Sequence, residues 1–217
     1  MKNLLLCTCV GDAYRSRFLA VKPQFEAYAA ACGSDMEVIE SPLDPAGKYG
    51  HFTQRLLIPR KFSRYEIVVH MDLDILIPKN LPDIFSVFPS SAGFSAVIDP
   101  RGSYAYQKAW GFDAWTRDSH QNFFKGLGLT SKCDLASING GVLVMRPRLI
   151  ADLAEAWYFD ETKSHPGTEE APLAYISQTH AMFAALEYRF NRQVLFGLHE
   201  TSPGQIAFEE YRSLWGR

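Results

Sequence analysis

The sequence predicts an α/β protein built on an open, largely parallel sheet with helices on its faces. From residue 3 to residue 77, short apolar runs rich in β-branched residues alternate with stretches of helical periodicity. Such alternation is typical of parallel sheets, whose ligands bind beyond the carboxyl ends of the strands. The chain has 217 residues, 47% of them hydrophobic, and no repeat or linker. We therefore expect a single domain with a large core.

The first strand is expected at residues 3–10. Its opening residues could be read as a signal sequence, but the apolar part ends at Gly11 without a small-residue cleavage pattern. Cys7 and Cys9 alternate with their neighbours, so both are expected on one face of the strand as small core residues. The chain's 4 cysteines show no second paired spacing. Reduced thiols are therefore expected rather than a disulfide framework or a metal site.

A helix is expected at 16–32 and a second short strand at 36–40. The helix carries a stripe of large apolar residues at helical spacing, namely Phe18, Val21, Phe25 and Tyr28. A loop at 41–47 with two prolines and a glycine leads to a helical stretch from about 52 to 63, which contains Arg55. The stripe predicts that the first helix packs on the sheet.

Residues 65–77 form the most informative segment. A run rich in Val and Ile leads into two carboxylates, Asp72 and Asp74, and a second apolar run follows. Two like charges this close repel each other unless a hard cation or a shared proton neutralises them. Ordinary turn residues are the alternative, although the nearest residue typical of a turn is Pro78. We predict a divalent-cation site at the end of this strand, facing the Val10–Tyr14 segment that follows the first strand.

The middle of the chain is less regular. A short helix is expected at 81–88 and a strand at 94–98. Residues 99–135 are rich in Tyr, Trp and Phe. Long aromatic-rich loops of compact domains are usually functional, so this one either stacks on sugar rings or bases or forms a small satellite core.

Asn139, Gly140 and Gly141 stand just before another predicted strand. Paired glycines permit unusual backbone angles and let a ligand approach the main chain closely. Asn139 would then aim its amide at a hydroxyl or carboxylate group. A simple turn is the alternative.

The last elements are a helix near 148–160, a second helix and a short strand. Thr168 is expected to cap the second helix, with Glu169 and Glu170 in its first turn. The strand, near 194–200, contains His199 close to its carboxyl end. A lone histidine is more often structural than a ligand, but this position favours a site.

Composition limits the classes of partner. The net charge is −2 and Lys and Arg form no long run, which argues against a general nucleic-acid binder. No apolar stretch approaches the roughly 20 residues that a membrane-spanning helix needs. We expect a cytoplasmic protein that works in solution or at a membrane surface.

These segments together resemble the GT-A-fold glycosyltransferases, most nearly the glycogenin-like and lipopolysaccharide-galactosyltransferase-like (family 8-type) group. The resemblance rests on Phe52–Leu56, on Asp72-Leu73-Asp74 followed by Asp83-Ile84-Phe85, on Asn139–Val142 and on His199. It implies one GT-A domain over 1–217, with a nucleotide-binding half at 1–100 and an acceptor and donor-sugar half at 101–217. It also implies transfer of a sugar from a nucleotide-sugar, UDP-linked in this group, to an acceptor that is a carbohydrate, a lipid-linked molecule or a protein.

The resemblance further implies a metal site that holds Mn²⁺ or Mg²⁺. Asp72 and Asp74 would bind the cation, with Asp72 also near the ribose, and His199 would be the third protein ligand. Thr8 and Tyr14 would contact the nucleobase.

The other roles concern the phosphates and the sugar. Arg55 would lie beside the phosphates. Asn139 and Gly140 would contact the donor sugar or the acceptor, and Glu169 or Glu170 would meet the transferred sugar. Because the nearest enzymes retain the anomeric configuration, retention is the expected outcome.

Two departures from the family pattern leave other functions open. Residues 200–205 follow His199 without the family's lysine, and a glutamate replaces the family's aspartate at 169 or 170. The missing lysine permits a non-catalytic or degenerate nucleotide-sugar-binding protein. A haloacid-dehalogenase-type phosphatase also carries Asp-x-Asp after an apolar strand, but there the motif lies near the chain start and a hydroxyl residue takes the place of Leu76.

Overall fold

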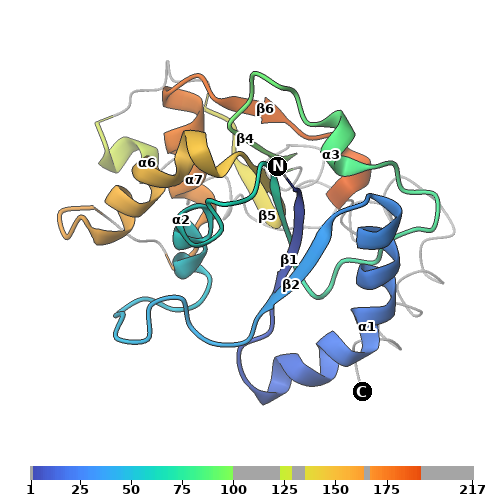
Figure 1. Cartoon of the computed structure of the whole chain (residues 1–217). Helices are drawn as coiled ribbons and strands as arrows, with labels where there is room; N and C mark the ends of the chain where they lie inside the picture. The colour runs from blue at the N-terminus through green and yellow to red at the C-terminus, as the bar shows by residue number, and fades with distance from the viewer. Residues whose placement is uncertain (1, 100–122, 129–134, 164–166, 192–217) are drawn as a thin grey trace, which may run out of the picture.

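The structure is a computed structural model that describes residues 2–99, 123–128, 135–163 and 167–191. Its strands are β1 (Leu4–Thr8), β2 (Asp35–Ile39), β3 (Val68–Met71), β4 (Phe94–Ile98), β5 (Ile138–Met145) and β6 (Phe183–Ala185). Its helices are α1 (Asp12–Ala31), α2 (Ile58–Lys61), α3 (Ile84–Val87), α6 (Pro147–Phe159) and α7 (Glu170–Thr179), with 3₁₀ turns η1 (Thr53–Leu57) and η3 (Tyr188–Asn191). Figure 1 follows these elements along the chain.

The strands form one 6-stranded sheet in the order β2-β1-β3-β5-β4-β6. β5 pairs antiparallel with both β3 and β4, and the other neighbouring pairs are parallel. Every strand of this sheet except β5 therefore runs in the same direction, which confirms the predicted largely parallel sheet. Because β5 is reversed, its first residues lie at the edge where β3 ends.

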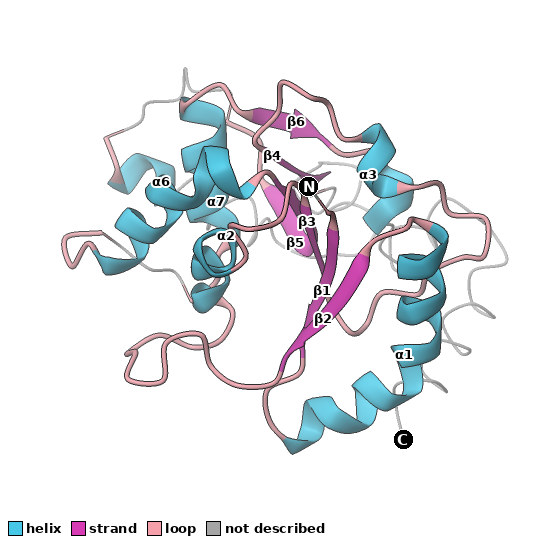
Figure 2. Cartoon of the chain, viewed as in Figure 1, coloured by secondary structure: helices cyan, strands magenta, loops and turns pink. Residues whose placement is uncertain are grey.

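Helices cover both faces of the sheet, as Figure 2 shows. α1 and α3 pack on one face against Leu5 and Val69, while η1, α2, α6 and α7 pack on the other against Leu4 and Val68. Side chains of successive strand residues point to opposite faces, so apolar runs such as Leu4–Leu6 supply both cores. The predicted stripe on α1 is buried, and Cys7 and Cys9 lie in the same core as that stripe.

Several boundaries differ from the prediction. α1 begins at Asp12 rather than residue 16, because Gly11 adopts a φ of 92° and turns the chain directly from β1 into the helix. The predicted helix at 52–63 is η1 followed by the single turn of α2. Thr168 is not the cap of α7: Glu169 holds the N-cap position and makes no side-chain capping bond, because its carboxylate is used elsewhere.

Some predicted features lie outside the described residues. These are the strand near 194–200 with His199 and most of the aromatic region at 99–135. In the described part of that region, Phe123 and Phe124 are buried in the core, and Phe123 packs against Trp157 with ring centroids 6.0 Å apart. Among the described helices, none is long and apolar enough to cross a bilayer. The sheet itself combines strands from both predicted halves of the chain.

The burial of α1 gives a test of the fold. Phe25 is fully buried between α1 and the sheet, whereas Leu19 on the same helix is 62% exposed. We expect Phe25→Ala to lower the free energy of unfolding by about 3–5 kcal/mol, through lost burial and an unfilled cavity. Leu19→Ala should change it by less than about 0.5 kcal/mol. Urea unfolding of the two variants checks this, and equal losses would contradict the assigned helix face.

Candidate active site

The candidate site lies where β3 ends and β5 begins. Asp72 directly follows β3, and its backbone N–H donates to the carbonyl oxygen of Gly141 at 2.8 Å. In an all-parallel sheet the start of β5 would lie at the opposite edge. The reversal of β5 therefore brings two segments that are about 70 residues apart in the sequence, at Asp72 and Gly141, into direct contact.

The start of β5 separates from β4 at a bulge. Leu143 pairs with Ala96 while Asn139 pairs with Val97, so Gly140 to Val142 have no partner residues on β4. A bulge frees backbone groups from the ladder and is frequent beside active sites. Side chains from the rest of the site form hydrogen bonds with the free backbone groups of this bulge.

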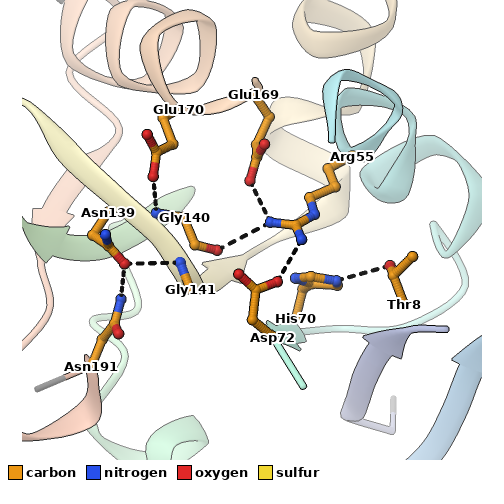
Figure 3. A network of polar contacts seen from close by, with 10 residues as sticks. All are labelled: Thr8, Arg55, His70, Asp72, Asn139, Gly140, Gly141, Glu169, Glu170 and Asn191. Carbon is orange, nitrogen blue, oxygen red and sulfur yellow. Dashed lines mark hydrogen bonds and ion pairs between the residues drawn. The ribbon is translucent and has the colours of Figure 1, made fainter. Parts of the chain in front are cut away.

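Arg55 is the centre of these contacts, as Figure 3 shows. Its Nη2 donates to Oδ1 of Asp72 at 2.5 Å, and its Nη1 donates to Oε1 of Glu169 at 2.7 Å. A longer bond of 3.5 Å reaches the carbonyl oxygen of Gly140. The Arg55 side chain is only 6% exposed, so the guanidinium joins η1, β3, the bulge and the start of α7 inside the protein.

The glutamates at α7 have different surroundings. Glu169 is 1% exposed, and its Oε2 is buried without a hydrogen-bond partner among the described residues. Glu170 is half-buried and accepts the N–H of Gly140 at 2.7 Å. Helix α7 therefore contributes one enclosed carboxylate, which faces Arg55, and one partly exposed carboxylate, which holds the bulge.

Close packing explains both glycines. A Cβ on Gly140 would lie 2.6 Å from Oε1 of Glu169, and one on Gly141 would lie 3.0 Å from Oδ1 of Asn191. Neither glycine adopts a positive φ. The two glycines therefore do not use the positive φ that glycine permits, and the predicted placement of the pair before the strand is wrong, since both lie within β5. The groups that approach the two glycines in the structure are protein side chains, and the close approach of a ligand stays a prediction.

Two further pairs complete the network. Asn139 accepts the N–H of Gly141 at 3.0 Å and the Nδ2–H of Asn191 at 2.5 Å, so its amide oxygen holds the bulge. Thr8 Oγ1 lies 3.0 Å from Nε2 of His70. His70 is fully buried on the same side of β3 as Asp72.

Burial is the main influence that opposes the ionisation of Asp72. Burial raises the pKa of Asp72 to about 7, against the lowering effect of Arg55, and the nearby Asp74 and Glu169 raise it further. Burial disfavours the charged form of Arg55, but Glu169 and Asp72 raise its pKa above the ordinary value. Burial, with Arg55, lowers the pKa of His70 well below its usual value, so the imidazole is neutral. The site has an excess of acid that a cation would offset.

The donor chemistry fits a hard divalent cation. Asp72 is partly exposed and Asp74 is exposed, so carboxylate oxygens of both can reach a ligand. Oxygen donors of this kind suit Mg²⁺ and Mn²⁺. The residues that the structure describes hold no group of three acids, histidines or cysteines placed for a metal. The predicted third ligand, His199, lies outside them.

Aromatic side chains extend from the site toward α1. Tyr14, in the first turn of α1, packs edge-on to His51 with centroids 5.4 Å apart, and His51 lies 4.2 Å from Phe52. The Arg55 guanidinium carbon stands 4.7 Å from the Phe52 ring centroid. Tyr14 therefore belongs to a chain of rings that ends at Arg55, on the side of the site where β1 ends.

A pocket opens beside Asp74. It has a volume of about 360 Å³, and Asp74 and Asn191 are both in its wall. The remaining lining is mainly the apolar loop after Asp74, with Arg189 and Phe190 of η3. The pocket thus borders Asp74 and shares no lining residue with the chain of rings.

Comparison with solved structures supports the predicted architecture. A glycosyltransferase involved in the glycosylation of the major capsid of PBCV-1 superposes with a TM-score of 0.53 and 15% identity, over 87% of this chain and 82% of that chain. GlyE of Streptococcus pneumoniae TIGR4 superposes with a TM-score of 0.51 and 13% identity, over 98% of this chain and 50% of that chain. The bifunctional glycosyltransferase WbbM superposes with a TM-score of 0.51 and 13% identity, over 87% of this chain and 39% of that chain. The chain has the GT-A fold.

This chain spans about half of GlyE and less of WbbM. At these identities the likeness concerns the fold. No protein-family model matches the chain, and no curated protein matches its sequence.

The structure brings together most of the predicted site residues. Arg55, Asp72, Gly140 and Glu169 form one connected network, while Glu170 and Asn139 bind the bulge. Thr8 contacts His70, and Tyr14 lies beyond His51. Three polar residues were missed by the sequence reading: His51, His70 and Asn191. His70 stands two residues before Asp72, so strand alternation places both on one face, but nothing in the sequence pairs Asn191 with Asn139.

The packing of the bulge can be tested at Gly140. Gly140→Ala would push a methyl group against the Glu169 carboxylate that Arg55 holds, so we expect the free energy of unfolding to fall by about 1–3 kcal/mol. Gly50→Ala is the matched control, because its Cβ would meet nothing within 4 Å. Denaturant unfolding of both variants measures the difference. Two equally stable variants would contradict the close approach of Glu169 to the bulge.

Proposed function

We propose that the protein is a metal-dependent glycosyltransferase that moves a sugar from a nucleoside-diphosphate sugar, UDP-linked, to an acceptor hydroxyl group. One observation carries the proposal. In a GT-A fold, Asp72 and Asp74 stand at the end of β3, directly opposite the glycine-containing bulge of β5. The resemblance of these two segments to the family's motifs supports the same assignment.

Asp72 and Asp74 are the proposed cation ligands, with His199 as the third. The cation, Mn²⁺ or Mg²⁺, would supply positive charge for the diphosphate, which becomes more negative as it leaves. Asp72 offers one carboxylate oxygen, because the other accepts from Arg55. Asp74 offers an exposed carboxylate on a backbone fixed from behind, since Gln24 of α1 bonds the main chain of Ile75 and Ile77.

Thr8 and Tyr14 are proposed to bind the nucleobase. Tyr14 provides a ring on which a base can stack, and His51 supports that ring from its edge. The Thr8 side chain is oriented by His70, whose neutral imidazole can either donate to or accept from the hydroxyl group.

The sugar is proposed to bind at the bulge, near Asn139, Gly140 and Glu170. Glu170 is the more exposed acid of α7, so we assign it, rather than the enclosed Glu169, to contact sugar hydroxyl groups. During transfer the bond from the anomeric carbon to the diphosphate oxygen breaks and that oxygen keeps the electron pair. The acceptor oxygen bonds to the anomeric carbon and releases its proton. We propose retention of configuration, on the resemblance alone.

A nucleotide-sugar-binding protein without catalysis is the second candidate. The sequence from Glu200 to Gln205 favours it, because no lysine follows His199 to bind the diphosphate. Turnover separates the two candidates: slow metal-dependent hydrolysis of a UDP-sugar requires the transferase. The phosphatase alternative is not retained, since the chain has the GT-A fold.

The proposal is tested by calorimetric binding of UDP with Mn²⁺ and with EDTA. We expect UDP to bind more tightly with Mn²⁺ than with EDTA, and the binding with Mn²⁺ to weaken at least about tenfold, or about 1.4 kcal/mol, in Asp74→Asn, because one charged metal ligand is lost. Asp152→Asn removes the same charge from the exposed surface of α6 and should bind as the wild type does.

Two results would contradict the proposal. One is the absence of binding to UDP and also to GDP, CMP and dTDP. The other is binding that is equally strong in EDTA and unaffected by Asp74→Asn. UDP-sugars that bind would next be screened for hydrolysis, which identifies the donor.

A further inference from the structure

The buried guanidinium of Arg55 directs three of its five N–H groups at protein acceptors. It donates to Asp72, Glu169 and Gly140, and its Nε is buried without a hydrogen-bond partner among the described residues. The side chain is 6% exposed. A residue that binds phosphate must turn N–H groups toward the ligand, and this geometry turns them toward the protein. The expected position beside the phosphates therefore does not explain what Arg55 does.

The contacts of Arg55 fix the orientation of Asp72. Arg55 engages Oδ1, and no hydrogen bond among the described residues engages Oδ2 of the same carboxylate. The Asp72 side chain is 25% exposed, so one edge of the carboxylate reaches the surface. A carboxylate held at one oxygen by a planar, charge-assisted bond presents the other oxygen in a defined direction.

Glu169 keeps Arg55 in that position. Its Oε1 accepts a hydrogen bond from Nη1 of Arg55, whereas Asp72 accepts from the other terminal nitrogen, Nη2. Both partners are buried, so this bond is not weakened by exchange with water. Gly140 leaves the room that the Glu169 carboxylate occupies, since a side chain there would collide with Oε1.

We infer that Arg55 is a positioning residue, which orients Asp72 for the cation, and that Glu169 is the counterion that fixes Arg55. The inference rests on the proposed function. It assigns Arg55 and Glu169 no contact with the donor. Partners that orient a metal ligand from behind typically change metal affinity about 10–100-fold when they are altered.

The test measures Mn²⁺ affinity separately from nucleotide affinity. Free Mn²⁺ is followed by electron paramagnetic resonance in titrations with saturating UDP, and UDP affinity is measured by calorimetry in EDTA. We expect Arg55→Lys to weaken Mn²⁺ binding about 10–100-fold, because an ammonium group lacks the planar fork whose two terminal nitrogens each hold one carboxylate. UDP affinity in EDTA should not change.

Arg60→Lys is the matched control. Arg60 also stands between two acids, Asp152 and Glu155, but on the surface. We expect wild-type Mn²⁺ affinity in this variant. Glu169→Gln keeps a hydrogen-bond acceptor for Arg55 without the charge, so its Mn²⁺ affinity should lie between those of the wild type and Arg55→Lys. Circular dichroism shows whether each variant folds. If Arg55→Lys does not fold, Glu169→Gln serves as the test.

Four results would overturn the inference. Unchanged Mn²⁺ affinity in Arg55→Lys would remove the positioning role, and so would unchanged affinity in Glu169→Gln if only that variant folds. A loss of UDP affinity in EDTA would make Arg55 a direct phosphate ligand. If the wild-type protein binds no UDP under any condition, the proposed function fails first and the inference with it.

Discussion

The site depends on a charge that the fold has removed from water. The acids Asp72 and Glu169 converge inside the protein, and Arg55 is the cation that lies between them. Burying an ion costs several kcal/mol, which is recovered only with good geometry and with bonds to the remaining polar atoms. Here the geometry is good, yet Oε2 of Glu169 and Nε of Arg55 have no hydrogen-bond partners among the described residues. Such an arrangement is weak evidence for stability and is better explained by a role for Asp72.

The reversal of β5 makes that arrangement possible. Because β5 runs antiparallel to both strands beside it, its first residues meet the end of β3, and the bulge turns their backbone groups toward Arg55 and Glu170. α7 then begins where its first acids can meet the bulge. The fold thus brings three parts of the site to one edge of the sheet. They are the pair Asp72 and Asp74, the glycine-containing start of β5, and the carboxylates of Glu169 and Glu170.

Local sequence patterns predicted several of the elements that build the site. The β-branched run before Asp72 and the apolar stripe on α1 predicted β3, α1 and the burial of both, because burial on one or two faces leaves a periodic signal. The glycine pair was found, but its reason was not, since the colliding groups belong to Glu169 and Asn191 far along the chain. No local pattern could pair Arg55 with Glu169.

Strand direction was the second feature that the sequence could not predict. Apolar content predicts that a strand is buried but not which way it runs between its neighbours, and β5 shows the consequence. The expected cap at Thr168 failed for a related reason: α7 begins at acids that are occupied by Arg55 and Gly140, so tertiary contacts decided the helix start. Both cases involve contacts between residues distant in sequence.

The most direct test of the central claim is the location of the cation. A crystal grown with UDP and Mn²⁺ would reveal the metal by its anomalous scattering. The account predicts one strong peak bound by Asp72 and Asp74 and by the diphosphate, with Arg55 still bonded to Asp72 behind it. A peak elsewhere, or a diphosphate bound directly by Arg55 with no metal at the aspartates, would contradict it.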